Sequence, residues 1–206
     1  MNSTPSANGI QEGPGLPCPT LAVLPLTSNK TTILNTISQM QALDQSQTMI
    51  NLGVIWGWRT LSPNWRGQWD GVSAELPVDY SNSNVTKVLM LLTDGTQTTG
   101  IPGAYKSWDA GFTSTSTVPS DPNSGGSTTQ LNTNLAADCT AVKATGIKVF
   151  TIAFGDTSTG LDDTTKALLQ NCSSGAGFYY VAPAPSDLAA ITSTIGAQIS
   201  QLALSQ

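Results

Sequence analysis

Apolar positions along the chain follow patterns that predict strands alternating with helices. An unbroken apolar run from Val88 to Leu92 is too short to cross a membrane. It suits a strand buried on both faces, as in the middle of a parallel sheet. We expect two further strands, from Ile147 to Phe154 and from Phe178 to Val181. The short segment from Leu21 to Leu26 contains a proline and is therefore expected to be an edge strand.

Helical spacing of apolar residues predicts the other elements. The first helix is expected over Asn29 to Gln41 and the second over Met49 to Trp58. Three more follow, of which the first ends at Gly146 and the last is capped by Ser186. The residues whose spacing predicts the five helices are, in chain order, Ile33, Leu34, Ile37 and Met40; Met49, Leu52 and Trp56; Leu131, Leu135, Cys139 and Val142; Leu161, Thr165, Leu168 and Cys172; and Leu188, Ile191, Ile195, Ile199 and Leu202.

Helices and strands in this alternating order predict an α/β fold. We expect a three-layer αβα, Rossmann-like arrangement, with helices on both faces of an open, mostly parallel sheet. A chain of 206 residues has room for one sizeable domain, which we place at residues 16–206. Residues 1–15 are expected to form a flexible N-terminal segment. Long loops are expected at residues 59–84 and 96–130.

Composition removes several classes of function. The formal net charge of -5 argues against nucleic acid, which needs a basic face. The sequence contains no histidine, which excludes Ser-His-Asp and Cys-His catalysis and histidine-ligated zinc. It shows neither a signal peptide after Met1 nor an apolar run of about 20 residues for a membrane helix. The chain is therefore either cytosolic or missing an upstream export segment, and we favour the second.

Asp94 is the first candidate for a functional residue. It follows the apolar run and precedes a glycine, so it is expected at the carboxyl edge of the sheet. Open α/β sheets place their ligand sites at that edge. The alternative is that Asp94 is a turn residue that bonds nearby backbone N–H groups.

Several motifs together resemble a known family. The segment K-V-L-M-L-L-T-D-G at residues 87–95 resembles the fourth-strand signature of von Willebrand factor type A domains. The block W-G-W-R-T-L-S-P at 56–63, followed by Trp65 and Trp69, sharpens the resemblance, as do V-F-T-I-A-F-G at 149–155 and the region of Cys172. Over roughly residues 16–206 the chain is similar to the A-type domain of TadG-like tight-adherence (Flp) pilus assembly proteins.

The resemblance implies a metal-ion-dependent adhesion site built from three segments. Asp94 matches the third segment and Thr48 the second, although Thr48 is also placed to cap the helix that follows it. Carboxylate and hydroxyl oxygens suit Mg²⁺, Ca²⁺ or Mn²⁺. The first segment, Asp-x-Ser-x-Ser after a buried strand, is absent. Only residues 44–48 and 79–83 come close to this motif, and neither follows a buried strand. We therefore expect the first strand to lie upstream of Met1, or the site to be degenerate.

The three cysteines are expected to give one disulfide and one remaining thiol. The resemblance implies that Cys139 pairs with Cys172. The alternative is two buried thiols in a reduced protein. Cys18 has no evident partner in the sequence.

Trp65 and Trp69 lie in the loop that follows the second helix. One interpretation is that they pin this loop to the body of the domain. The other is that they form a partner-binding surface, because aromatic residues anchor interfaces.

Three functions remain open. The resemblance implies a non-enzymatic protein-binding or adhesion module at the bacterial envelope, outside the cytoplasm, in a parent protein that is membrane-anchored. Its partners would be proteins of the pilus or envelope machinery. A second hypothesis is a truncated structural fragment without activity of its own. A third is a metal-assisted hydrolase, for which Asp94 and Asp156 are the only evident carboxylates at strand ends.

Overall fold

The computed structural model describes residues 12–13, 16–17, 21–41, 48–97, 126–155 and 161–204. Several sequence-based expectations therefore lie outside the described residues. They concern most of the N-terminal segment 1–15, most of the string at 44–48, most of the loop at 96–130, Cys18 and Asp156.

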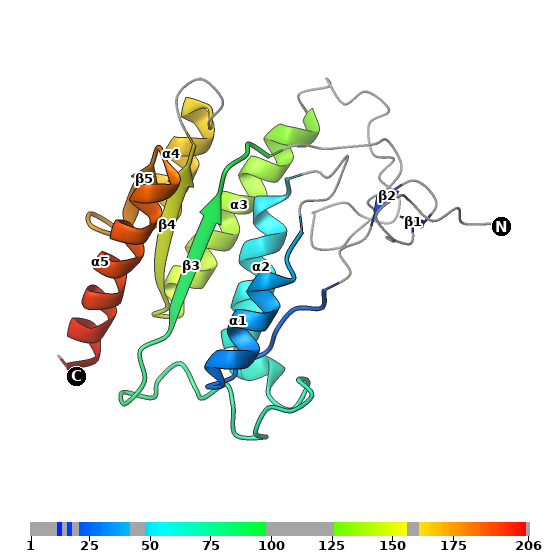
Figure 1. Ribbon diagram of the computed structural model, residues 1–206, viewed down its shortest axis with the longest axis vertical. Helices are drawn as coiled ribbons and strands as arrows, with labels where there is room; N and C mark the ends of the chain where they lie inside the picture. The colour runs from blue at the N-terminus through cyan, green and yellow to red at the C-terminus, as the bar shows by residue number, and fades with distance from the viewer. Residues whose placement is uncertain are drawn as a thin grey trace.

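A three-stranded parallel sheet forms the centre of the fold (Figure 1). Its strands lie in the order β3 (Val88–Thr93), β4 (Lys148–Phe154) and β5 (Tyr179–Ala182). Helices surround it, so the expectation of an α/β fold with an open parallel sheet is confirmed at this level. A separate antiparallel pair joins β1 (Glu12–Gly13) to β2 (Leu16–Pro17).

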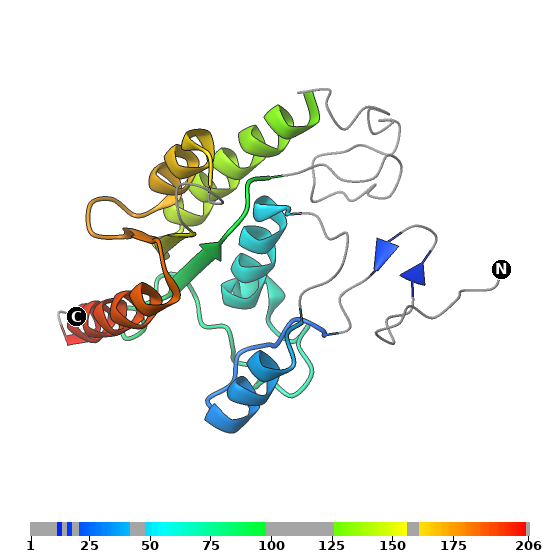
Figure 2. The ribbon, with the colours of Figure 1, turned by 45° about the horizontal axis from the view of Figure 1, so that its top comes forward.

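The helices cover the two faces of the sheet unequally. Helices α2, α3 and α4 pack on one face, here called the inner face, and α5 packs on the opposite, outer face. Helix α1 lies apart from the sheet (Figure 2). The bounds are α1 Lys30–Ser38, α2 Ile50–Leu61, the short 3-10 helix η1 Pro63–Trp65, α3 Gly126–Ala144, α4 Asp163–Cys172 and α5 Pro185–Leu204.

Strand β4 separates two hydrophobic cores because successive side chains on a strand point to opposite faces. Val149 belongs to the inner core, whereas Phe150 and Ile152 belong to the outer core with Ile195 of α5. Thr151 is fully buried on the inner face, where its hydroxyl donates to the carbonyl oxygen of Leu169 at 2.8 Å. This bond satisfies the one polar side chain in the middle of the strand.

Helix α3 forms as its apolar spacing predicts. Its row of Leu131, Leu135, Cys139 and Val142 is buried against the inner face. The helix ends before Gly146, whose φ of +87° lies in the region that favours glycine. The expected strand after it is also present, one residue shorter at its start.

The prediction that residues 88–92 are buried on both faces is wrong. Strand β3 is an edge strand of the described sheet, with β4 on one side. The side chains of Met90 and Leu92 are 44% and 52% exposed on the outer face. Helix α5 packs over β4 and β5; on β3, Val88 packs against the same outer core, whereas Met90 and Leu92 remain uncovered.

The expected apolar stripe of the second helix is also wrong. Met49, Leu52 and Trp56 are at least partly exposed, and Trp56 is 37% exposed. The buried residues of α2 are Ile50, Asn51 and Val54. Both sets of residues have helical spacing. Packing of α2 against α3 and β3 buries the set of Ile50, Asn51 and Val54.

Three smaller expectations need correction. Residues 21–26 form no strand, because no neighbouring segment pairs with them among the described residues. Helix α1 forms with Asn29 as its N-cap, but the expected apolar row is exposed and none of the helix's residues is buried. Helix α5 begins at Pro185, one residue before the expected cap at Ser186.

Among the described helices, none is long and apolar enough to span a membrane.

Candidate functional site

The turn after β3 holds Asp94 at the carboxyl edge of the sheet. The hydroxyl of Thr93 donates to the carbonyl oxygen of Gly95 at 3.0 Å and accepts from the N–H of Gly95 at 3.3 Å. Thr93 is buried, whereas Asp94 is exposed. Because Thr93 shapes the turn, the carboxylate of Asp94 is not used for it, and within the described residues no hydrogen bond of that carboxylate occurs. It faces solvent and is available to a ligand.

Thr48 lies against this turn although it is distant in sequence. A Cβ added at Gly95 would lie 3.0 Å from Oγ1 of Thr48. The absence of a side chain at Gly95 therefore permits this close approach. Thr48 does not cap α2, because the N-cap position is occupied by Met49. The two sequence-predicted metal ligands thus lie on adjacent segments.

A buried polar chain behind the turn was not predicted from sequence. The backbone N–H of Asn51 donates to Oε1 of Gln97 at 3.5 Å, and Nε2 of Gln97 donates to Oδ1 of Asn132 at 3.0 Å. Asn51 and Gln97 are 0% and 3% exposed. These contacts connect the first turn of α2, the segment after β3 and helix α3. No sequence signal points to them, because Asn51 takes part through its backbone N–H.

The ligand chemistry of this edge fits a hard divalent cation only in part. Asp94 supplies a carboxylate and Thr48 a hydroxyl, both oxygen donors suited to Mg²⁺, Ca²⁺ or Mn²⁺. The described residues contain no cluster of three or more acidic, histidine or cysteine side chains that would hold a metal. An ion here would take its remaining ligands from water or from a carboxylate of a bound partner.

The tryptophans gather toward the opposite end of α2. Trp65 packs edge-on against Trp56 with ring centroids 5.9 Å apart, and Trp69 packs against Trp65 at 5.6 Å. The guanidinium of Arg59 lies over Trp56 and Trp65 at 4.5 and 4.9 Å. Trp65 and Trp69 are half-buried, and the Nε1 atom of Trp69 is buried without a hydrogen-bond partner among the described residues.

Two basic residues hold the loop that follows η1. Arg66 donates from Nε and Nη2 to the carbonyl oxygen of Pro77 and pairs with Asp79 at 2.9 Å. Lys87 donates from Nζ to the carbonyl oxygens of Leu61 and Val78. Burial lowers the pKa of Lys87 below 10.5, the positive charge of Arg66 lowers it further, and Asp79 opposes both effects.

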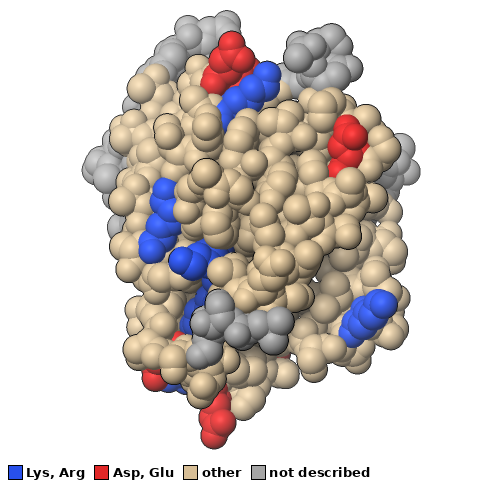
Figure 3. Space-filling view, turned by 90° about the vertical axis from the view of Figure 1, so that its left-hand side faces the viewer, with Lys and Arg blue, Asp and Glu red and all other residues tan. Residues whose placement is uncertain are grey.

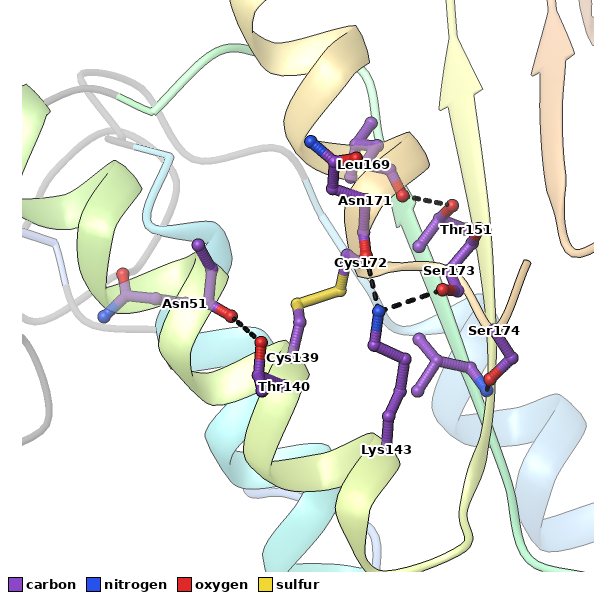
Figure 4. The surroundings of a disulfide bond; sticks show 12 residues. Asn51, Cys139, Thr140, Lys143, Thr151, Leu169, Asn171, Cys172, Ser173 and Ser174 are labelled. Atoms are coloured by element: carbon purple, nitrogen blue, oxygen red, sulfur yellow. Dashed lines mark hydrogen bonds between the residues drawn. A yellow bond between two sulfur atoms is a disulfide. The ribbon is translucent and has the colours of Figure 1, made fainter.

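A disulfide connects α3 to the end of α4 on the inner face (Figure 4). It joins Cys139 to Cys172, the pair that the resemblance implied, and both residues are buried. Close to it, Nζ of Lys143 donates to the carbonyl oxygens of Asn171 and Ser173. These bonds satisfy carbonyl groups at the C-terminal end of α4, where a positive charge is favourable.

Charged side chains are sparse on the face shown in Figure 3.

Comparison with known proteins gives no further guide to the site: no family model, no curated protein and no solved structure matches this chain.

Proposed function

We propose that the chain is a non-enzymatic protein-binding module of the von Willebrand factor A type, as in TadG-like pilus assembly proteins. Its contacts would run through the carboxyl edge of the sheet. One observation carries the proposal: the structure brings Thr48 against the turn that presents Asp94, although the two are far apart in sequence. These are the residues that match two of the three ligand segments of the family's adhesion site.

The mechanism follows from the geometry of the edge. Asp94 and the hydroxyl of Thr48 would bind one side of a divalent cation. Since two protein oxygens leave most coordination positions to water, a partner carboxylate can replace water and bind through the ion. The Thr93 hydrogen bonds and the Gln97 contacts keep the two segments in place before binding.

The location proposed for this module is outside the cytoplasm, in the periplasm or at the cell surface. The disulfide between two buried cysteines is compatible with an oxidising compartment. Envelope or pilus proteins are the proposed partners.

Calorimetric titration of the chain with Mg²⁺, Ca²⁺ and Mn²⁺ tests the proposal. We expect weak binding, with a Kd of about 0.1–1 mM because few ligands come from protein. Asp94→Ala should abolish the heat of binding. Asp70→Ala is the matched control, because Asp70 is also exposed but lies in the loop after η1. The proposal fails if none of the three ions binds, or if the two variants behave alike.

A further inference from the structure

Two side chains of helix α3 reach the C-terminal end of α4 (Figure 4). Cys139 and Lys143 are four residues apart, so they lie one turn apart on the same face of α3. Cys139 forms the disulfide with Cys172, the last residue of α4. Nζ of Lys143 donates to the carbonyl oxygens of Asn171 and Ser173, which flank Cys172 in the chain. The lysine therefore holds the backbone that carries the second cysteine.

The segment after α4 is also fixed to the sheet. The backbone N–H of Ser174 donates to the carbonyl oxygen of Val149 at 2.9 Å, and the N–H of Val149 donates to the hydroxyl of Ser174 at 2.8 Å. These two bonds fix the segment to β4, whereas the two bonds from Lys143 fix it to α3. None of these four bonds involves a sulfur atom. They can therefore form while both cysteines are still thiols.

The two cysteines are closed off from solvent in the folded chain. Cys139 is 1% exposed and Cys172 is 2% exposed. A reagent outside the fold reaches neither sulfur until the end of α4 opens. Thiol–disulfide exchange proceeds through a mixed disulfide with such a reagent, so the bond between the two cysteines forms only when the end of α4 returns to α3. The group that holds this end to α3 therefore determines how readily the bond forms.

We propose that Lys143 is a positioning residue for the formation of the disulfide between Cys139 and Cys172. In the first exchange, the thiolate of one cysteine attacks a sulfur of an external disulfide and releases one of its two thiolates. In the second, the thiolate of the other cysteine attacks the protein sulfur of the mixed disulfide and releases the remaining thiolate. The two cysteines lose two electrons and two protons, and the external disulfide is reduced to two thiols. Lys143 acts in the second exchange, because its bonds return the end of α4 to α3.

The test is an equilibrium titration of the whole chain with mixtures of reduced and oxidised glutathione, with a chelator present so that the ion site plays no part. After acid quenching and alkylation, peptide mapping quantifies the bond between Cys139 and Cys172 separately from any product of Cys18. Sucrose is added as needed until circular dichroism shows the reduced proteins to be folded. We expect Lys143→Met to lower the equilibrium constant for disulfide formation by about tenfold or more, the equivalent of about 30 mV for this two-electron couple.

Two control variants separate positioning from a general loss of stability. Lys166→Met makes the same substitution in α4 itself, where Lys166 pairs with Asp163 at 3.7 Å in the first turn, away from Cys172 at the other end. Gly57→Ala should destabilise the fold from α2 instead, by overpacking against Leu89. Both controls should keep the equilibrium constant within about twofold of the wild-type value.

Three outcomes overturn the proposal. The first is an equal equilibrium constant for wild type and Lys143→Met. The second is a loss of the same size in either control, because the effect would then come from charge on the helices or from stability alone. The third is a difference between wild type and Lys143→Met that persists in urea, where the fold is absent and Lys143 has no end of α4 to hold.

Discussion

At the scale of single residues, Lys87 connects three parts of the chain. Its Nζ donates to Leu61, which ends α2, and to Val78 in the loop, while its own backbone begins the ladder of β3 with β4. The same group lies 4.7 Å from the ring centroid of Tyr80. One side chain thus fixes the loop after η1 to the start of the sheet.

Replacing Lys87 with methionine is expected to lower the free energy of unfolding by about 1–3 kcal/mol, because two carbonyl oxygens lose their donor. Urea unfolding of the two proteins at pH 7 measures the difference. A change below about 0.5 kcal/mol, the size expected of an ordinary surface substitution, would contradict this role.

The effect of Lys87 on stability should also depend on pH. Its folded-state pKa is lowered mainly by burial, so between that pKa and 10.5 the unfolded chain binds more protons than the folded chain. Stability then rises with pH across this window. After Lys87 loses its proton, the neutral amine still has two N–H groups to donate to the carbonyl oxygens of Leu61 and Val78. We expect the advantage of wild type over Lys87→Met to grow as the pH is raised toward 10.5, and a constant or shrinking difference would contradict the assignment.

At the scale of elements, the packing of α2 on β3 depends on a glycine. A Cβ added at Gly57 would lie 2.5 Å from Cδ1 of Leu89, whereas a Cβ at Gly53 would meet nothing within 4 Å. Both glycines lie in the same helix, so they form a natural pair for separating packing from helix propensity.

Gly57→Ala is expected to lower the free energy of unfolding by about 1–3 kcal/mol through overpacking. Gly53→Ala should instead raise it by about 0.5–1 kcal/mol, since alanine is the better helix former. Chemical denaturation of both variants measures the contrast. Equal stabilisation by the two substitutions would show that α2 does not press on Leu89.

Local periodicity explains why some elements were predictable and others were not. The row of Leu131, Leu135 and Cys139 lies on a helix whose spacing alone identifies the buried face. The exposure of Met90 and Leu92 depends on what lies beside and above β3, which no local pattern records. In α2, residues on two faces of the helix have helical spacing, and contacts with α3 determine which face is buried.

The candidate site was predictable only where a motif marked it. Asp94 follows from the end of an apolar run before a glycine, and Thr48 from the family resemblance. The part played by Gln97 and Asn132 could not be predicted, because both lie in polar sequence without a distinctive pattern. Their importance comes from contacts between segments that are distant in the chain.

At the scale of the whole molecule, the disulfide is the main covalent constraint on the described fold. It closes a loop with a sequence separation of 33 residues and joins α3 to α4 over the inner face. Strand β4 lies between the two helices in sequence, so the bond encloses the central strand. Loss of the bond should therefore lower the free energy of unfolding of the described fold as a whole.

The double variant Cys139→Ala/Cys172→Ala should be less stable by about 3–4 kcal/mol in the chain-entropy account. Thermal and urea unfolding measure the loss. A reductant should destabilise the wild type by a similar amount and leave the double variant unchanged. A loss below about 1 kcal/mol, or sensitivity of the double variant to reductant, would contradict this role.

The proposed function depends on a divalent cation binding at the carboxyl edge of β3. The most direct measurement is the broadening of backbone amide signals by Mn²⁺ in ¹H–¹⁵N spectra of the chain, because the paramagnetic effect locates the ion. We predict that the signals of Thr48, Asp94 and Gly95 broaden first and that Asp94→Ala removes the effect. Broadening centred elsewhere, such as at Asp70, or no selective broadening, would contradict the claim.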